Sequence, residues 1–382
     1  MAPTAGRWSS ISYGPLSNID LMATPRTSTT EPLSTNSRTP RGRAAVREIS
    51  ISEPEPAQVE FQLANNTHLH GAPPAALRVI RSARDADLAQ YPSPTGRELR
   101  LALADWIGVH PSEVVVGCGS EELIDCAYRA LCEPGGRVAC IAPTFVMARL
   151  FATTNALVPV AVPLTGEFDA DAEALLGADP DLIYLCTPNN PTGVPLREET
   201  VRTIVERFHG PIVIDEAYAE FTDRSFACEA VESGRVVVLR TFSKAWGLAG
   251  LRVGYAVGAK DIVTPIETVR APFKLNALGE RAAAAALRED VAWMRAGVEE
   301  TAALRERFSR ELRALGRSPL PSSTNFVLIP VPNAGALAAT LRSRGVAVRP
   351  FSKLPVVGDA VRVSIGPWEA LRRVLDVFAD GA

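Results

Sequence analysis

The segment from Arg240 to Tyr255 reads RTFSKAWGLAGLRVGY and places one lysine, Lys244, shortly after the apolar run Val236–Leu239. A lysine is costly to bury without a partner and is usually exposed to water. Its ordinary interpretation is a side chain that lays its stem on apolar surface or forms an ion pair. The alternative is a nucleophilic amine that forms a Schiff base with a carbonyl compound in a desolvated site.

Polar segments follow three other apolar runs of the sequence. Ile212–Ile214 is followed by DEAY at 215–218, Leu182–Cys186 by TPNNPTG at 187–193, and Val114–Val116 by GCGSEE at 117–122. In open α/β sheets, ligands bind outside the carboxyl ends of the strands, so we expect these segments to meet in one crevice. The glycines of GCGSEE would let backbone N–H groups approach an anion at a helix N-terminus.

Each of these segments also has an ordinary structural interpretation. Asp215 can cap a helix, Tyr218 can pack in the core, and Asn190–Pro191 is a common start of a turn. Together, an anion cradle, a carboxylate, a phenol, an amide, a lysine and an arginine describe a site for pyridoxal phosphate. In such sites the lysine forms the Schiff base and an aspartate partners the pyridinium nitrogen. The combination therefore predicts a pyridoxal-phosphate protein.

The motifs that carry these residues resemble those of the class I/II aminotransferases of fold type I, and most of all the histidinol-phosphate aminotransferase group. The resemblance runs from about Phe61 to the C-terminus. Its motifs are PNNPTG at 188–193, DEAYAEF at 215–221, RTFSKAWGLAGLRVGY at 240–255, YPSPTGRELR at 91–100 and VGCGSEELI at 116–124. It implies an α/β fold with a mostly parallel central sheet flanked by helices, together with a smaller α/β domain.

The resemblance also implies the roles of residues around the cofactor. The catalytic residues would be Lys244, which forms the Schiff base and later acts as a general base, Asp215, which partners the pyridine nitrogen, and Tyr218, which bonds the phenolic oxygen together with Asn190. The phosphate would be held by Gly119, Ser120, Glu121, Thr241, Ser243 and Arg252. Phe145 would stack on the ring. Tyr91 would reach the cofactor of a neighbouring subunit, which implies a homodimer with shared active sites.

On the substrate side, the resemblance implies that Arg362 and Asn190 bind the carboxylate and that Arg349 binds a phosphate group. The donor would be an amino acid or an amino phosphate such as histidinol phosphate, and the acceptor a 2-oxo acid such as 2-oxoglutarate. Three residues depart from the family pattern, in which Glu, Tyr and an aromatic residue are common at the positions of Thr67, His70 and Ala148. We expect the donor side chain to reach toward His70 and the space beside Ala148.

Two other functions share this cofactor or scaffold. A decarboxylase of the threonine-phosphate type has the same cofactor residues and differs in which bond of the substrate Cα is broken, which no motif reports. A cofactor-binding regulator would carry a DNA-binding domain, and residues 1–56 show no helix-turn-helix pattern. Because Lys244 and Asp215 are both present, the sequence favours an enzyme.

Short apolar runs alternate with helix-length segments from Ala86 onward, which is typical of a mostly parallel sheet with helices on both faces. The predicted strands of this sheet are 114–116, 137–141, 156–162, 182–186, 212–214, 236–239 and 255–257. Further strands are expected at 325–329, 347–349 and 361–365, with a helix at 334–344. The predicted parts of the chain are a disordered tail (1–56), an N-terminal segment of the small domain (57–85), the large cofactor-binding domain (86–279) and the small C-terminal domain (280–382).

The composition of the chain argues against several other classes of protein. The chain has 382 residues, a formal charge of -3 and 47% hydrophobic residues, which predicts a soluble globular protein with no broad basic surface for nucleic acid or membranes. No run of about eighteen apolar residues indicates a membrane span. The six cysteines show no CxxC and no paired Cys/His spacing, which favours reduced thiols in the cytoplasm and no metal site.

Overall fold

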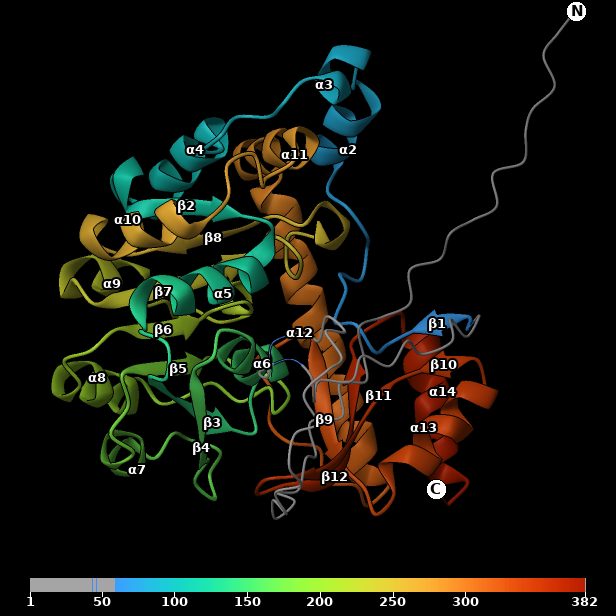
Figure 1. The fold of residues 1–382 in the computed structure, drawn as a ribbon. Coiled ribbons are helices and arrows are strands. Elements are labelled where there is room, and N and C mark those ends of the chain that lie inside the picture. Colours follow the sequence, from blue (N-terminus) through green and yellow to red (C-terminus); the bar gives the residue numbers. More distant parts are fainter. Residues whose placement is uncertain (1–42, 44–45, 47–58, 382) are drawn as a thin grey trace, which may run out of the picture.

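A seven-stranded sheet forms the centre of the larger part of the molecule (Figure 1). The structure is a computed structural model and describes residues 43, 46 and 59–381, so nearly all of the tail predicted at 1–56 lies outside the described residues. The strands, in their order across the sheet, are β2 (Val114–Gly117), β8 (Gly254–Val257), β7 (Val236–Thr241), β6 (Ile212–Asp215), β5 (Leu182–Cys186), β3 (Arg137–Ala142) and β4 (Val158–Pro163). Strand β8 is antiparallel to both of its neighbours, β2 and β7, and the other neighbouring pairs are parallel, so the mostly parallel sheet is confirmed.

Helices cover both faces of this sheet. The helices of this part of the molecule are α2 (Pro74–Arg81), α3 (Asp85–Ala89), α4 (Arg97–Ile107), α5 (Gly119–Leu131), α6 (Val146–Thr154), α7 (Ala172–Gly177), α8 (Glu198–Arg207), α9 (Ala227–Ser233), α10 (Lys260–Val269) and α11 (Ala277–Glu289), of which α3 has no buried residue. Three 3₁₀ turns accompany them, η1 (Pro111–Glu113), η2 (Ala219–Phe221) and η3 (Ala249–Leu251). Within the described part of the chain, no helix is both long and apolar enough to cross a membrane.

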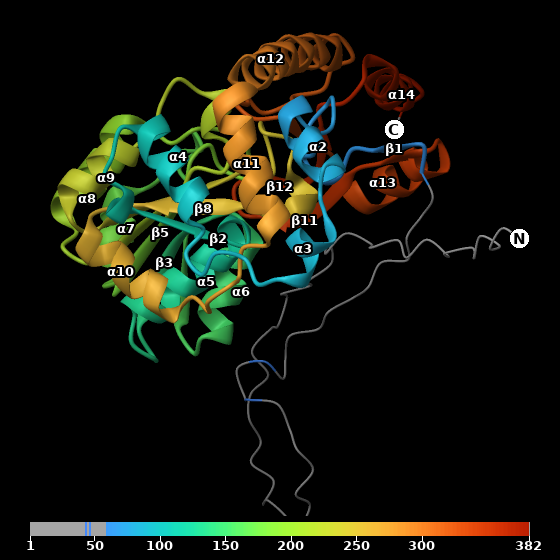
Figure 2. The same ribbon diagram turned by 90° about the horizontal axis from the view of Figure 1, so that it is seen from above.

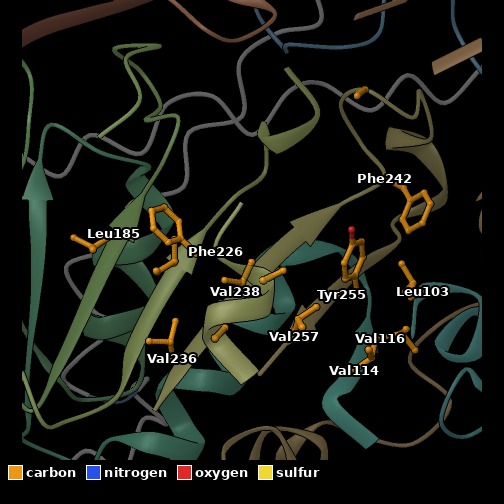
Figure 3. Packing of buried hydrophobic residues seen from close by; sticks show 14 of the residues in the cluster. Leu103, Val114, Val116, Leu185, Phe226, Val236, Val238, Phe242, Tyr255 and Val257 are labelled. Carbon is orange, nitrogen blue, oxygen red and sulfur yellow. The ribbon is translucent and has the colours of Figure 1, made fainter. Parts of the chain in front are cut away.

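The central strands are apolar on both sides because each face of the sheet packs against helices. In β7, Val236 and Val238 belong to the core cluster on the side of α4, α8, α9 and α11, part of which is shown in Figure 3. Val237 and Leu239 point the other way and pack with α5, α6 and α10. Successive side chains of a strand alternate between faces, so an uninterrupted apolar run is what a doubly covered strand requires.

A smaller unit is formed by the C-terminal third of the chain and one N-terminal strand (Figure 1). Its elements are β1 (Phe61–Gln62), α12 (Val291–Ala314), β9 (Phe326–Pro330), α13 (Ala334–Ser343), β10 (Val346–Ala347), β11 (Arg349–Leu354), β12 (Gly358–Ser364) and α14 (Trp368–Ala379). Strands β11, β12 and β9 form an antiparallel sheet in that order, and β1 pairs with β10 in parallel.

Two strand predictions need correction. The strand predicted at 156–162 begins at Val158, because Ala156 has a φ of +61° and its N–H bonds the carbonyl of Thr153 in the turn after α6. The single strand predicted at 347–349 is two strands with different partners, since β10 pairs with β1 whereas β11 pairs with β12. Neither change is visible in apolar periodicity, because partners are chosen by tertiary contacts.

The hydrophobic cores do not divide at the predicted domain limits. Ala76 of α2 and Ala283 of α11, both predicted in the small domain, belong to the core of the large sheet, and the two helices lie side by side (Figure 2). Met294 near the start of α12 also belongs to that core, whereas Phe308 and Leu312 near its end belong to the core of the smaller unit. We therefore propose that the boundary lies within α12 and not at Gly279.

Candidate active site

Lys244 follows β7 and has a partly buried side chain. Its Nζ atom lies 3.5 Å from the carbonyl oxygen of Asn65 and 5.8 Å from the centre of the Tyr218 ring. Burial lowers the pKa of Lys244 from its usual 10.5 to about 8, and the nearby charge of Arg362 acts in the same direction. A larger fraction of this amine is therefore neutral near pH 7 than for an exposed lysine, as a nucleophile requires.

Asp215 ends β6 and is buried, with 2% of its surface exposed. The Tyr184 hydroxyl on β5 donates a hydrogen bond to its Oδ2 atom at 2.7 Å, and the backbone N–H of Ala217 donates to Oδ1 at 3.1 Å. Burial raises the pKa of Asp215 to about 6 although both hydrogen bonds act to lower it. A cationic ring nitrogen beside this carboxylate would supply the missing counter-charge.

Tyr218 and Asn190 follow β6 and β5 and lie on the side of the site that faces β12. The Tyr218 hydroxyl accepts a hydrogen bond from Asn66 Nδ2 at 2.9 Å, and Asn190 Oδ1 accepts one from Arg362 at 2.5 Å. The preceding residue, Asn189, is fully buried and bonds neighbouring loops instead. Of the two asparagines in PNNPTG, only Asn190 contacts another predicted site residue.

The start of α5 forms the predicted phosphate cradle together with Arg252. Gly119 begins the helix with a φ of +82°, and a Cβ atom there would lie 2.7 Å from Arg252 Nη2. Gly254 on β8 is equally constrained, because its Cβ would lie 2.4 Å from the backbone nitrogen of Ser120. The two glycines thus let a strand and a guanidinium approach the first N–H groups of a helix, which is an anion-binding arrangement.

Side-chain hydroxyls complete the cradle. Thr241 donates a hydrogen bond to Ser243 Oγ at 2.9 Å, and Arg252 Nη1 lies 3.5 Å from that same oxygen. Arg252 also pairs with the Glu121 carboxylate at 3.3 Å. Only the backbone N–H of Glu121 is therefore suited to a phosphate. All six residues predicted to hold this group are brought to one end of the sheet.

Behind the site, a buried ion pair joins the ends of β6 and β7. Arg240 Nε and Nη2 donate to Glu216 Oε2 at 3.0 and 2.8 Å, and both side chains are almost fully buried. Glu216 Oε1 also accepts from the backbone N–H of Phe226 at 2.6 Å. This ion pair links the end of β6, which carries Asp215, to the end of β7, which precedes Lys244. No role was predicted for it from the sequence.

Two arginines face each other across β11 and β12. Arg349 and Arg362 are Cα partners in this antiparallel pair. Arg362 donates to Asn190 and to the carbonyl of Ala64, while its Nε atom is buried without a partner. Burial and the charge of Arg349 both lower the pKa of Arg362, to about 10. Within the described residues neither guanidinium forms an ion pair with a carboxylate, so the pair is suited to an anionic ligand.

The segment after β1 contributes contacts that sequence inspection missed. Three consecutive residues bond three predicted site residues: Ala64 O accepts from Arg362, Asn65 O from Lys244, and Asn66 donates to Tyr218. No local pattern could have identified them, because two of the three contacts use backbone carbonyls and all of the partners are distant in sequence.

The remaining predicted residues lie apart from this group or contact only the core. His70 Nε2 bonds Glu300 of α12 at 2.7 Å, and no hydrogen bond, ion pair or ring contact within the described residues joins it to another predicted site residue. Ala148 is fully buried in the core beside α5, so it leaves no open space for a donor side chain, and that expectation was wrong. Phe145 is partly buried at the start of α6. Tyr91 is 85% exposed beside Phe273.

The cysteines and metal-ligating side chains of the described residues are the candidates for a second centre. All six cysteines lie in the described part of the chain and none is in a disulfide. Within the described residues, no group of three or more His, Cys, Asp or Glu side chains is placed to hold a metal ion.

The residues present fit pyridoxal phosphate. The crowded approach of Gly119, Arg252 and Gly254 leaves a cradle for an anion at a helix N-terminus, and a carboxylate and an amine with shifted pKa values lie at neighbouring strand ends. Gly119, Ser120, Thr241, Ser243 and Arg252 would hold the phosphate, Asp215 the ring nitrogen and Lys244 the aldehyde carbon. When bound, the cofactor would supply an electron sink for cleavage of a bond at the substrate Cα.

Comparison with known proteins agrees with this fit. The model of the family described as aminotransferase class I and II matches residues 59–378. A protein of Roseiflexus castenholzii named histidinol-phosphate aminotransferase is 37% identical over 342 residues, covering 86% of this chain and 91% of that protein. Histidinol-phosphate aminotransferase 1 of Archaeoglobus fulgidus is also 37% identical, covering 82% of this chain and 99% of that one.

A solved structure shows the same architecture. The histidinol-phosphate aminotransferase of Sinorhizobium meliloti, in complex with pyridoxal 5'-phosphate, has a TM-score of 0.80 and 25% identity, covering 90% of this chain and 98% of that one. The chain therefore belongs to the class I and II aminotransferase family. It is a pyridoxal-phosphate-dependent aminotransferase of fold type I, which confirms the family, fold and cofactor predicted from the motifs.

Proposed function

We propose that this aminotransferase takes its amino group from a donor that carries a phosphate, such as histidinol phosphate, and passes it to a 2-oxo acid such as 2-oxoglutarate. The observation that carries the proposal is the pair Arg349 and Arg362, which face each other without an acidic partner among the described residues. A planar guanidinium suits phosphate and carboxylate groups. The names of the relatives point to the same donor.

The chain's own residues divide the work of transamination. Arg349 would bind the phosphate of the donor, so that its Cα–H bond is held toward Lys244. Arg362 would bind the α-carboxylate of the 2-oxo acid when that substrate replaces the donor. The Lys244 amine, with its pKa lowered to about 8 by burial, would accept the Cα proton and return it at another carbon. Tyr218 and Asn190 would bind the cofactor's phenolic oxygen, and Asp215 would keep its ring nitrogen protonated.

The decarboxylase and regulator alternatives are not favoured. The matched family model and the relatives carry the description aminotransferase, and a purely regulatory protein would not need the buried Lys244 and Asp215 pair. A carbon dioxide assay on each amino donor would detect decarboxylation directly.

Shared active sites in a homodimer are part of the proposal. Tyr91 is 85% exposed and packs on Phe273, itself 41% exposed, and Leu88 nearby in sequence is 69% exposed. An apolar surface of this kind suits a second copy of the chain, whose cofactor Tyr91 would then reach. Light scattering that finds an active monomer at assay concentration would contradict this. The cytoplasmic location stays a prediction.

Donor half-reactions of purified enzyme would test the substrate proposal. The donors are histidinol phosphate and neutral aromatic amino acids, and the visible absorbance of the cofactor reports each reaction without an acceptor. Arg349→Gln should lower kcat/KM for histidinol phosphate by well over tenfold, since losing a buried anion contact costs about 2 to 5 kcal/mol. It should spare the neutral donors. The control is Arg342→Gln on the exposed face of α13. Equal losses on both donor types would show that Arg349 has a structural role only.

A further inference from the structure

Asn66 is buried in the middle of the site, although no role was predicted for it from the sequence. Only 1% of its surface is exposed, and it holds a left-handed backbone conformation with a φ of +54°. Its carbonyl accepts a hydrogen bond from Asn325 Nδ2 at 2.9 Å, and its backbone N–H donates to Ser364 Oγ at the same distance. Asparagine is one of the few residues with a side chain that adopts this conformation readily.

The hydrogen bonds of Ser364 determine which way the Asn66 amide points. The Ser364 hydroxyl accepts from the Asn66 N–H and donates to Asn66 Oδ1, each at 2.9 Å. If the amide were flipped, the serine proton would lose this acceptor, so the oxygen faces Ser364 and the nitrogen faces Tyr218. Asn66 Nδ2 then donates to the Tyr218 hydroxyl oxygen at 2.9 Å.

A phenol that accepts this hydrogen bond keeps its own proton for another partner. Within the described residues, no group accepts the Tyr218 proton. We propose that Asn66 is a positioning residue, which by donating to Tyr218 leaves the tyrosine proton directed at the cofactor's phenolic oxygen. This rests on the role proposed for Tyr218. In this relay both side-chain hydrogen bonds are donated in the same direction, from Ser364 to Asn66 and from Asn66 to Tyr218.

Other charged or titratable groups near Tyr218 are Lys244, Arg362, Asp215 and the Cys186 thiol, and all remain in the variants below. Asn66→Asp is nearly isosteric, tolerates the left-handed backbone and can no longer donate from a side-chain nitrogen. Its carboxylate would instead accept the Tyr218 proton and reverse the relay. Asn66→Gly keeps the backbone conformation and removes the side chain, which leaves the tyrosine proton free.

The first experiment uses cofactor-free protein and reads the hydrogen bond itself. The Raman Fermi doublet of tyrosine distinguishes a phenol that accepts from one that donates, and subtracting the spectrum of Tyr218→Phe isolates this residue. We expect an acceptor signature for wild type and a donor signature for Asn66→Asp. A donor signature in wild type would overturn the proposal, whatever the substrates of the enzyme prove to be.

The second experiment measures the consequence in cofactor-loaded protein, with no donor substrate present. A hydrogen bond donated to the anionic phenolic oxygen stabilises the deprotonated chromophore, so its loss should raise the pH midpoint of the visible absorbance change. Hydrogen bonds to charged groups are among the stronger ones, so Asn66→Asp should raise the midpoint by about one to two pH units. Asn66→Gly leaves the tyrosine proton free but no longer directed, so it should raise the midpoint by less than Asn66→Asp does.

A double-mutant cycle separates the relay from the added charge of the aspartate. Placed in the Tyr218→Phe background, Asn66→Asp should shift the midpoint far less than it does alone. Equal shifts in both backgrounds would mean that the new charge acts by itself, and the proposal would fail. If Tyr218→Phe alone leaves the midpoint unchanged, Tyr218 does not contact the cofactor as proposed, and the predicted effect of Asn66 on the midpoint fails with it. The Raman result still decides whether Asn66 donates to Tyr218.

Discussion

The cofactor side and the substrate side of this site are built on opposite principles. On the cofactor side, Asp215 accepts two hydrogen bonds, and the Arg240–Glu216 pair joins the strand ends. On the substrate side, Arg349 and Arg362 oppose each other on neighbouring strands, and no described carboxylate balances them. The cofactor side is hydrogen-bonded within the chain and lacks only the counter-charge of Asp215, whereas the substrate side keeps excess positive charge.

The difference follows from what each half has to bind. A resident cofactor needs groups in fixed positions, which buried hydrogen bonds supply before the ligand arrives. Two substrates must alternate on the other side, so a charged pair that any suitable anion can neutralise serves both. Like charges directly opposite on a sheet are destabilising, and a bound anion removes that cost.

Lys244→Ala should abolish transamination, with a loss of roughly 10⁴-fold or more, because it removes both the nucleophile and the general base. Turnover with excess donor and acceptor measures the effect, and a circular dichroism melt checks that the fold persists. The borohydride-reducible lysine adduct should also disappear. A variant with near-normal turnover would exclude Lys244 as the Schiff-base residue.

Arg240→Met should destabilise the protein by about 3 to 5 kcal/mol, because it leaves the Glu216 carboxylate buried without its cation. Urea denaturation measures the change. The control is Arg202→Met, which breaks exposed ion pairs with Glu198 and Glu229 and should have a much smaller effect, because solvent screens exposed pairs. Similar losses for both variants would mean that the strand ends are not held by the buried pair.

Asp215→Asn should stabilise the cofactor-free protein at pH 8 and lose that advantage below about pH 4. Burial raises the pKa of Asp215 from 3.8 to about 6 in the folded protein. Above pH 6 the carboxylate is charged in both the folded and the unfolded protein, and burying that charge lowers the free energy of unfolding. Below about pH 4 the group is protonated in both, so this cost disappears. The gain can reach about 3 kcal/mol. Denaturation at both pH values measures it. With cofactor bound the sign should reverse, and a gain that persists when the cofactor is loaded would contradict the proposed ring-nitrogen contact.

Arg349→Gln should raise the stability of the protein by about 0.5 kcal/mol in a buffer without multivalent anions, since it removes one of two opposed charges. Thermal melts in such a buffer and in inorganic phosphate provide the measurement. Phosphate should stabilise wild type more than the variant. Equal responses to phosphate would indicate that the arginine pair does not bind this anion.

Much of the fold could be predicted because it depends on local signals. Strands such as Ile212–Asp215 are buried on both faces, so their sequences are uninterrupted apolar runs, and polar residues follow them at one edge of the sheet. Several residues that the family resemblance assigns to the cofactor, such as Asn190 and Lys244, lie in the segments that follow strands, which is where polar residues interrupt the apolar runs. The division of the core within α12 was not, because Met294 and Phe308 belong to one helical pattern and differ only in what packs on them.

The sheet and the cofactor could be predicted from the amino-acid sequence, since strand, turn and glycine signals act over a few residues, and the role of Lys244 stays a prediction. Tertiary structure alone decided that His70 pairs with Glu300, that Ala148 is closed off by the core, and that Asn66 donates to Tyr218. Asn66 and Tyr218 are 152 residues apart in the chain. Such contacts depend on how separate elements pack, and apolar periodicity carries no information about them.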